Sequence, residues 1–132
     1  MSEAIEVVQA FLGALGTSHA DSLAAIEKFC TDDCIWKNSG LPTQTGKAAM
    51  QGFLDKFRAV SGLGQVDVEM LAISADGDTV LTERIDHLKT DDGTLVMSLA
   101  LMGRFDVRGG QIALWSDYFD ATPFQPMLPA LS

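Results

Sequence analysis

Hydrophobic residues in the first half of the chain recur at the spacing of helices. One series near the start falls three and four residues apart: Ile5, Val8, Phe11, Leu12 and Leu15. The pattern breaks between Gly16 and Asp21, where Ser18 or Asp21 can cap a second helix that runs to Phe29. A third series, from Lys47 to about Val60, again places its apolar residues on one face. These series predict three amphipathic helices.

Apolar segments bounded by turn signals replace the helical spacing after Gly64. Four of them, "QVDVEMLAIS", "DTVLTERIDHLKT", "TLVMSLALMGRFDV" and "QIALWSDYFD", are separated by "ADGD", "DDG" and "RGG". Short turns between such segments predict a meander of antiparallel strands. The upstream stretch "TDDCIWKNSGLPTQTG" is typical of a short strand followed by a loop. We therefore predict one α+β domain over residues 1–132, with helices covering one face of a curved sheet.

The segment around Arg84 fits two secondary structures. Leu81, Ile85 and Leu88 also occur at helical spacing, so periodicity alone does not identify a strand. The turn signals at both ends favour the strand. In a strand, Arg84, Asp86 and Leu88 share one face with Thr82.

An aspartate stands among aromatic residues in the last predicted strand. Asp117 shares a face with Trp115 and Phe119, which are typical of a buried side. Burying a carboxylate without a partner costs several kcal/mol, so we expect a cation nearby, and Arg84 is the candidate. The alternative is that Arg84 and Asp86 form an ordinary surface ion pair that contributes little.

Composition narrows the class of protein. Hydrophobic residues make up 47% of the 132, and part of this surplus is expected to line a cavity or a subunit interface. Nine lysines and arginines stand against 18 acidic residues, and this charge of -9 argues against nucleic acid or an anionic membrane as partner. No signal peptide is evident after Met1 and no apolar run approaches the ~20 residues that span a bilayer, so we expect a cytoplasmic protein.

The two cysteines do not indicate a metal site. Cys30 and Cys34 are four residues apart without a nearby set of further ligands, so we predict a helix-face or helix-end pair of buried thiols. The chain also lacks a glycine-rich phosphate loop and a Ser-His-Asp order. We therefore predict no metal and no cofactor.

Three motifs occur in a specific order: "IWKNSGLPTQTG", "TERID" and "LWSDYFD". With this order and spacing the chain resembles the limonene-1,2-epoxide hydrolase family, from the first helix to about Phe119. That family belongs to the wider group with the fold of nuclear transport factor 2 and the SnoaL-like cyclases. The resemblance implies a cone-shaped α+β barrel of a mostly antiparallel sheet, and a homodimer packed through the sheet.

The resemblance also implies roles for individual residues. Arg84, Asp86 and Asp117 match the Asp-Arg-Asp triad of the family, and Asn38 matches its water-holding asparagine. Trp36 stands where the family has a second water ligand, a tyrosine. A phenol can accept or donate a hydrogen bond, whereas an indole N–H only donates, so this departure affects how a water is held. The expected wall of a substrate pocket is Trp36, Leu88, Leu99, Leu101 and Phe119.

The implied activity is addition of water to a small hydrophobic epoxide, terpenoid-like or cyclic, to give a vicinal diol. Opening an epoxide requires an acid for the departing oxygen and a base for the attacking water, which two aspartates with separated pKa values can supply. Two alternatives stay open. One is an isomerase or cyclase of the ketosteroid isomerase or SnoaL kind, and the other is a ligand-binding domain of the same fold without activity.

Overall fold

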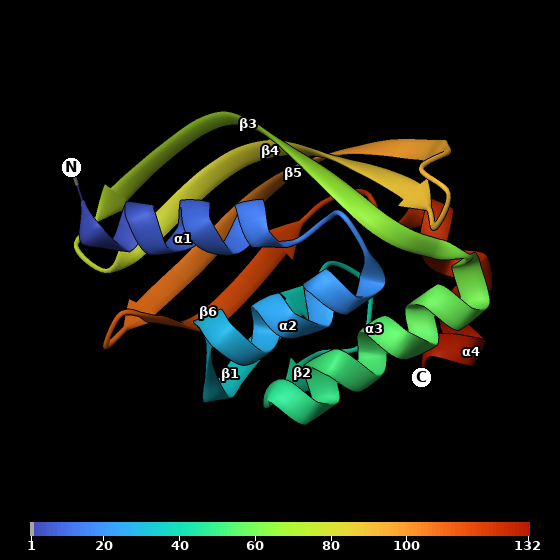
Figure 1. Cartoon of the computed structure of the whole chain (residues 1–132), viewed down its shortest axis with the longest axis horizontal. Helices are drawn as coiled ribbons and strands as arrows, with labels where there is room; N and C mark the ends of the chain where they lie inside the picture. The colour runs from blue at the N-terminus through green and yellow to red at the C-terminus, as the bar shows by residue number, and fades with distance from the viewer. Residues whose placement is uncertain (1) are drawn as a thin grey trace.

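A curved sheet with helices on one side makes up the computed structural model, which describes residues 2–132 (Figure 1). In chain order the elements are α1 (Glu3–Ala14), α2 (His19–Phe29), β1 (Cys30–Asn38), β2 (Gln44–Thr45), α3 (Lys47–Ser61), β3 (Leu63–Asp76), β4 (Thr79–Thr90), β5 (Leu95–Arg108), β6 (Gln111–Tyr118), the 3₁₀ helix η1 (Thr122–Met127) and α4 (Leu128–Leu131). The three predicted helices and the four-strand meander are confirmed. The sequence did not indicate β2, η1 or α4.

Local signals explain where the helices begin and end. The side chain of Ser2 accepts a hydrogen bond from the Ile5 N–H at the start of α1, and Ser18 caps α2 through the Asp21 N–H. Of the two predicted caps, Ser18 is therefore the one used. α3 ends at Gly62, which adopts a left-handed conformation (φ 76°) that favours glycine.

The sheet places β4, β5 and β6 side by side at its centre. Its strand order is β2-β1-β6-β5-β4-β3, and β2 and β3 form unpaired edges, so the sheet curves without closing. All neighbours are antiparallel except β1 and β6, which are parallel. The strand interpretation of the Arg84 segment is confirmed, since the segment forms β4. Arg84 and Asp117 thus lie two strands apart, with β5 between them.

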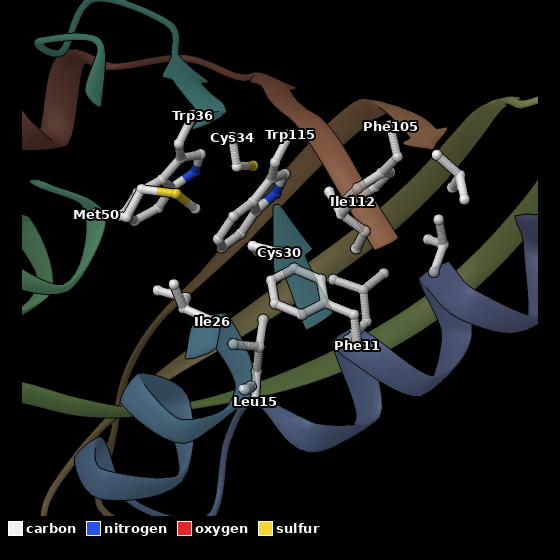
Figure 2. Close-up of a cluster of buried hydrophobic side chains, with 14 of the residues drawn as sticks. Phe11, Leu15, Ile26, Cys30, Cys34, Trp36, Met50, Phe105, Ile112 and Trp115 are labelled. Carbon is white, nitrogen blue, oxygen red and sulfur yellow. The ribbon is translucent and has the colours of Figure 1, made fainter. Parts of the chain in front are cut away.

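An aromatic core fills the space between the helices and the sheet (Figure 2). Phe11 of α1 is fully buried and contacts Trp115 edge-on, with ring centroids 5.0 Å apart. Cys30 and Cys34 are free thiols buried in the same core. Cys30 is the C-cap of α2 and the first residue of β1, whereas Cys34 lies within β1. The short strand predicted for this stretch is therefore confirmed, and the prediction of a helical pair was wrong for Cys34. The cause is the immediate passage from α2 into β1, without a loop.

Among residues 2–132, no helix combines the length and the hydrophobicity that crossing a bilayer requires.

Candidate active site

Arg84 joins two aspartates at the centre of the sheet. Its guanidinium donates to both carboxylate oxygens of Asp117, from Nη1 to Oδ1 at 3.1 Å and from Nη2 to Oδ2 at 2.9 Å. Contacts with Asp86 are longer, 3.5 Å from Nε to Oδ1 and 3.4 Å from Nη2 to Oδ2. Nη1 also donates to the hydroxyl of Thr82 at 3.1 Å. All five N–H groups of a fully buried arginine can therefore reach an acceptor.

Gly103 makes the contact between Arg84 and Asp117 possible. The register pairs Gly103 of β5 with Thr82 of β4 on one side and with Asp117 of β6 on the other. The guanidinium of Arg84 passes over β5 at Gly103 and so reaches Asp117 on β6. A Cβ atom on residue 103 would lie under 3.0 Å from Arg84 Nη1, Asp117 Oδ1 and Thr82 Oγ1. The ion pair thus occupies the volume that any side chain at this position would need.

Asp117 receives one further hydrogen bond, from the indole N–H of Trp115 at 3.0 Å. A carboxylate offers about four lone-pair positions, and three donors leave about one of them free. β1 runs parallel to β6, and in the register of these two strands Asn38 lies beside Asp117. The Ser39 N–H donates to the Asp117 backbone oxygen at 3.2 Å, and this bond ties the end of β1 to that position.

Burial sets the proton affinities of the two aspartates. The side chain of Asp86 is 14% exposed and that of Asp117 is 4% exposed. Desolvation raises the pKa of Asp117 to about 6, against the opposing effect of Arg84. It also raises the pKa of Asp86 above its ordinary value, again against Arg84. Burial disfavours the Arg84 cation, but the two carboxylates outweigh this and raise its pKa.

Burial and hydrogen bonding act in opposite directions on the choice of protonated group. Deeper burial favours a proton on Asp117, whereas the shorter contacts with Arg84 and the bond from Trp115 favour its ionised form. Asp86 has only the two long contacts to Arg84. Hydrogen bonds to a charged acceptor are roughly twice as strong as neutral ones, so the carboxylate charge is better stabilised on Asp117.

Both aspartates face an apolar pocket between the sheet and the helices. Its wall includes every pocket residue expected from sequence: Trp36, Leu88, Leu99, Leu101 and Phe119, together with Asn38, Asp86 and Asp117. Arg84 is not part of the wall, since it lies beneath the two carboxylates. α2, α3 and η1 contribute further wall residues that the strand pattern could not indicate, among them Ser22, Phe53, Phe57 and Phe124.

Three residues that contact the ion pair were not predicted from sequence: Thr82 as an acceptor, Gly103 as the crossing point and Trp115 as a donor. Trp115 stands two residues before Asp117 on the same face, which was a usable signal. Nothing in the sequence distinguishes Gly103 from a turn glycine, because its role depends on strand register.

A family model and two relatives above 30% identity indicate one family. Residues 2–130 match the model of the limonene-1,2-epoxide hydrolase catalytic domain. The chain is 37% identical over 113 residues to epoxide hydrolase EphG of Mycobacterium tuberculosis, covering 86% of this chain and 70% of that protein. An LEH-like epoxide hydrolase structure from M. tuberculosis is 33% identical and has a TM-score of 0.74, covering 96% of this chain and 90% of that one. An NTF2-like protein of Burkholderia pseudomallei shares the fold, with a TM-score of 0.76 at 15% identity over 97% and 98% of the two chains.

A methyl group at position 103 tests the crossing point. Gly103→Ala is expected to lower the free energy of unfolding by about 1–3 kcal/mol, because the new Cβ displaces Arg84 or Asp117. Urea denaturation followed by circular dichroism measures the difference. Gly52→Ala in α3 is the matched control, since a Cβ there meets nothing within 4 Å. The control should keep or gain up to about 1 kcal/mol. Equal behaviour of the two variants would contradict the crossing-point role.

The raised pKa of Asp117 predicts a pH dependence of stability. The Asp117 carboxyl has a pKa of about 6 in the folded protein, against an ordinary value of 3.8. The bound proton therefore contributes fully to the free energy of unfolding below pH 4, and this contribution is lost as the pH rises through about 6. The loss corresponds to about 3 kcal/mol. Urea unfolding between pH 4 and pH 7 should show the wild type losing this amount relative to Asp117→Asn, which cannot titrate. Parallel curves for the two proteins would show that burial does not raise this pKa.

Proposed function

The chain belongs to the limonene-1,2-epoxide hydrolase family, and on that premise we propose that it adds water in one step to a small hydrophobic epoxide, terpenoid-like or cyclic, to give a vicinal diol. One observation carries the proposal: two aspartates share a buried arginine and both face an apolar pocket. The reaction needs one acid and one base, and this arrangement supplies a pair. We propose no cofactor.

Asp117 is the base in this proposal and Asp86 the acid. Asp117 carries the better stabilised carboxylate, and a pKa of about 6 leaves it ionised at neutral pH while still able to take up a proton. Asp86 is assigned the proton because its contacts with Arg84 are longer than those of Asp117, while burial raises the pKa of both carboxyl groups. One cation, one carboxylate and one neutral acid leave no net charge in the cluster.

The proposed step balances without a covalent intermediate. A water between Asn38 and Asp117 gives a proton to Asp117 while its oxygen forms a bond to one epoxide carbon. The bond between that carbon and the epoxide oxygen breaks, and Asp86 gives its proton to the departing oxygen. After the diol leaves, proton exchange with solvent restores the acid on Asp86 and the carboxylate on Asp117.

The pocket wall suits a hydrocarbon substrate whose only polar group is the epoxide. Leu88 lies on β4 two residues after Asp86, and on β5 Leu99 pairs with Asp86 and Leu101 with Arg84. Phe119, two residues after Asp117, also lines the pocket. Apolar walls exclude bulk water, which strengthens the electrostatic effect of the two carboxylates. An isomerase of the ketosteroid kind instead needs donors aimed at an enolate. The Arg84 donors are all directed at Asp117, Asp86 and Thr82, which favours water addition.

Isotope labelling tests the proposed reaction. Purified protein is incubated with limonene-1,2-epoxide and a panel of cyclic epoxides in ¹⁸O-labelled water, with enzyme in excess. We expect diol that carries the solvent label in the first turnover. Asp86→Asn and Asp117→Asn should each lower the rate by about 10²–10⁴-fold, the range for general acid–base catalysis. Asp76→Asn, a change to an exposed residue in the β3–β4 hairpin, is the control and should keep the full rate.

Two results would contradict the mechanism. Unlabelled diol in the first turnover would show that the oxygen comes from an enzyme carboxylate through a covalent intermediate. Absence of diol with every epoxide, from protein that is folded by circular dichroism, would exclude hydrolysis of this substrate class. Proton exchange on ketones would then support the isomerase alternative.

The outer face of the sheet supports a homodimer as a further part of the proposal. Leu71, Leu81, Met102 and Tyr118 are each at least half exposed there. These four residues, the outer patch, come from four adjacent strands, and Met102 pairs in register with Tyr118. Exposed apolar residues on neighbouring strands suit a two-fold interface, and Glu83 and Arg104, which pair in register with Met102 and Leu81, add charged groups between them.

Introduction of negative charge tests the interface. The double variant Met102→Glu/Tyr118→Glu is expected to sediment as a monomer, because a two-fold axis brings like charges together. Val60→Glu in α3 adds a charge at another exposed apolar residue and should remain a dimer. Analytical ultracentrifugation at tens of micromolar measures both. A wild-type chain that sediments as a monomer would rule out the outer patch as a stable interface.

A further inference from the structure

Ser22 places an unpaired hydroxyl in the wall of the apolar pocket. It lies in the first turn of α2, and the residue is only 6% exposed. Its backbone N–H donates to the Ser18 oxygen, but its hydroxyl has no hydrogen bond among residues 2–132. The unpaired side-chain atoms that are sealed in this part of the chain are Thr31 Oγ1 and Trp36 Nε1, so the Ser22 hydroxyl is open on its pocket side. An open hydroxyl in an apolar wall is suited to bind a polar group of a ligand.

His19 stands one helical turn before Ser22 and also lines the pocket. Its Nε2 lies 2.6 Å from Oδ1 of Asp55 on α3, which runs beside α2 (Figure 1). A carboxylate only accepts hydrogen bonds, so Nε2 carries the proton and neutral His19 has a lone pair at Nδ1. Nδ1 has no partner among the described residues. Residues three apart on a helix share a face, so this acceptor and the Ser22 hydroxyl border the same part of the pocket.

His19 and Gln65 mark the polar end of the apolar pocket. Both also line a second, more polar hollow, together with Arg58 and Asp91. This hollow lies where the α1–α2 turn, the end of α3, the start of β3 and the β4–β5 turn meet. Arg58 and Asp91 form an ion pair there, and Gln65 donates to the Asp91 backbone oxygen at 2.8 Å. Because two residues border both spaces, the polar hollow adjoins the pocket.

We propose that Ser22 and His19 form a subsite for a hydroxyl group, which binds the diol product as it passes from the pocket to the polar hollow. The inference rests on the proposed function, because that reaction supplies the diol. The subsite is separate from the reacting centre, since Ser22 and His19 lie on α2 whereas both aspartates lie on the sheet.

The two groups distinguish a hydroxyl from an epoxide oxygen. An epoxide oxygen accepts hydrogen bonds but cannot donate, so it can pair with Ser22 and not with the lone pair of His19. A hydroxyl can accept from Ser22 and donate to Nδ1 of His19 at the same time. A diol among apolar walls also needs partners for its hydroxyl groups, whereas the hydrocarbon part of the ligand needs none. The subsite therefore favours the product over the substrate.

NMR titration of ¹⁵N-labelled protein locates the diol without any need for turnover. The probes are cyclohexane-1,2-diol and tetrahydropyran, a six-membered ring whose oxygen only accepts. We expect the diol to move the backbone amide signals of residues 19–23 and of Gln65 more than tetrahydropyran does. Changes with the diol that are confined to the strands around Asp86 and Asp117 would overturn the inference.

Two substitutions test the two groups of the subsite. Ser22→Ala is expected to weaken binding of cyclohexane-1,2-diol about twofold to tenfold, the effect of one lost hydrogen bond. Ser74→Ala, at an exposed position of β3, is the matched control and should bind the diol as the wild type does. His19→Phe removes the acceptor, so it should weaken binding of the diol and not of tetrahydropyran. Equal diol affinities of Ser22→Ala and Ser74→Ala, both folded by circular dichroism, would overturn the inference.

Failure of the subsite and failure of the proposed function give different results. If labelled diol forms from an epoxide but neither the α2 signals nor Ser22→Ala responds to the diol, hydrolysis stands and the subsite is overturned. If no epoxide yields diol but cyclohexane-1,2-diol binds at Ser22, the proposed function fails and the subsite stands as one for hydroxyl-bearing ligands.

Discussion

The ion pair between Arg84 and Asp117 determines much of the surrounding structure. A buried guanidinium requires an acceptor for each of its N–H groups, and these are supplied by Asp117, Asp86 and Thr82. The pair spans β4 to β6, so it needs β5 to present no side chain between them, which Gly103 provides. Strand register, a single glycine and two carboxylates thus form one interdependent unit.

The same burial that raises the proton affinity of the aspartates lowers the stability of the fold at neutral pH. Asp117 carries its charge at a place where burial disfavours that charge, and part of this cost is offset by Arg84 and Trp115. Functional sites commonly retain such groups, because a perturbed pKa is what acid–base chemistry requires. The aromatic rings of Phe11, Trp36 and Trp115 pack against one another. The apolar surface that they bury stabilises the fold and offsets the cost of the buried charge.

Much of the fold could be predicted from the sequence, because its signals are local. Helical spacing, Ser18 at a helix start and short turns between apolar segments specified three helices and four strands. β2, with two residues, and the short helices after Thr122 have too little periodicity to be detected. Cys34 was predicted both in a helical pair and in a short strand, because α2 passes into β1 without a turn signal, and the structure confirms the strand. The prediction of secondary structure thus failed where an element was very short or where no turn residue separated two elements.

The sequence by itself determined which residue types stand on which face of each strand, since side chains alternate with a period of two. That alternation put Arg84 with Asp86, and Trp115 with Asp117, before any contact was known. Only the tertiary structure decided that β1, β6, β5 and β4 lie in this order, which brings Asn38 beside Asp117 and makes Gly103 the crossing point. It also decided that one indole N–H is paired and the other is not. Strand order and register depend on contacts between distant segments, and a single sequence carries no local signal for them.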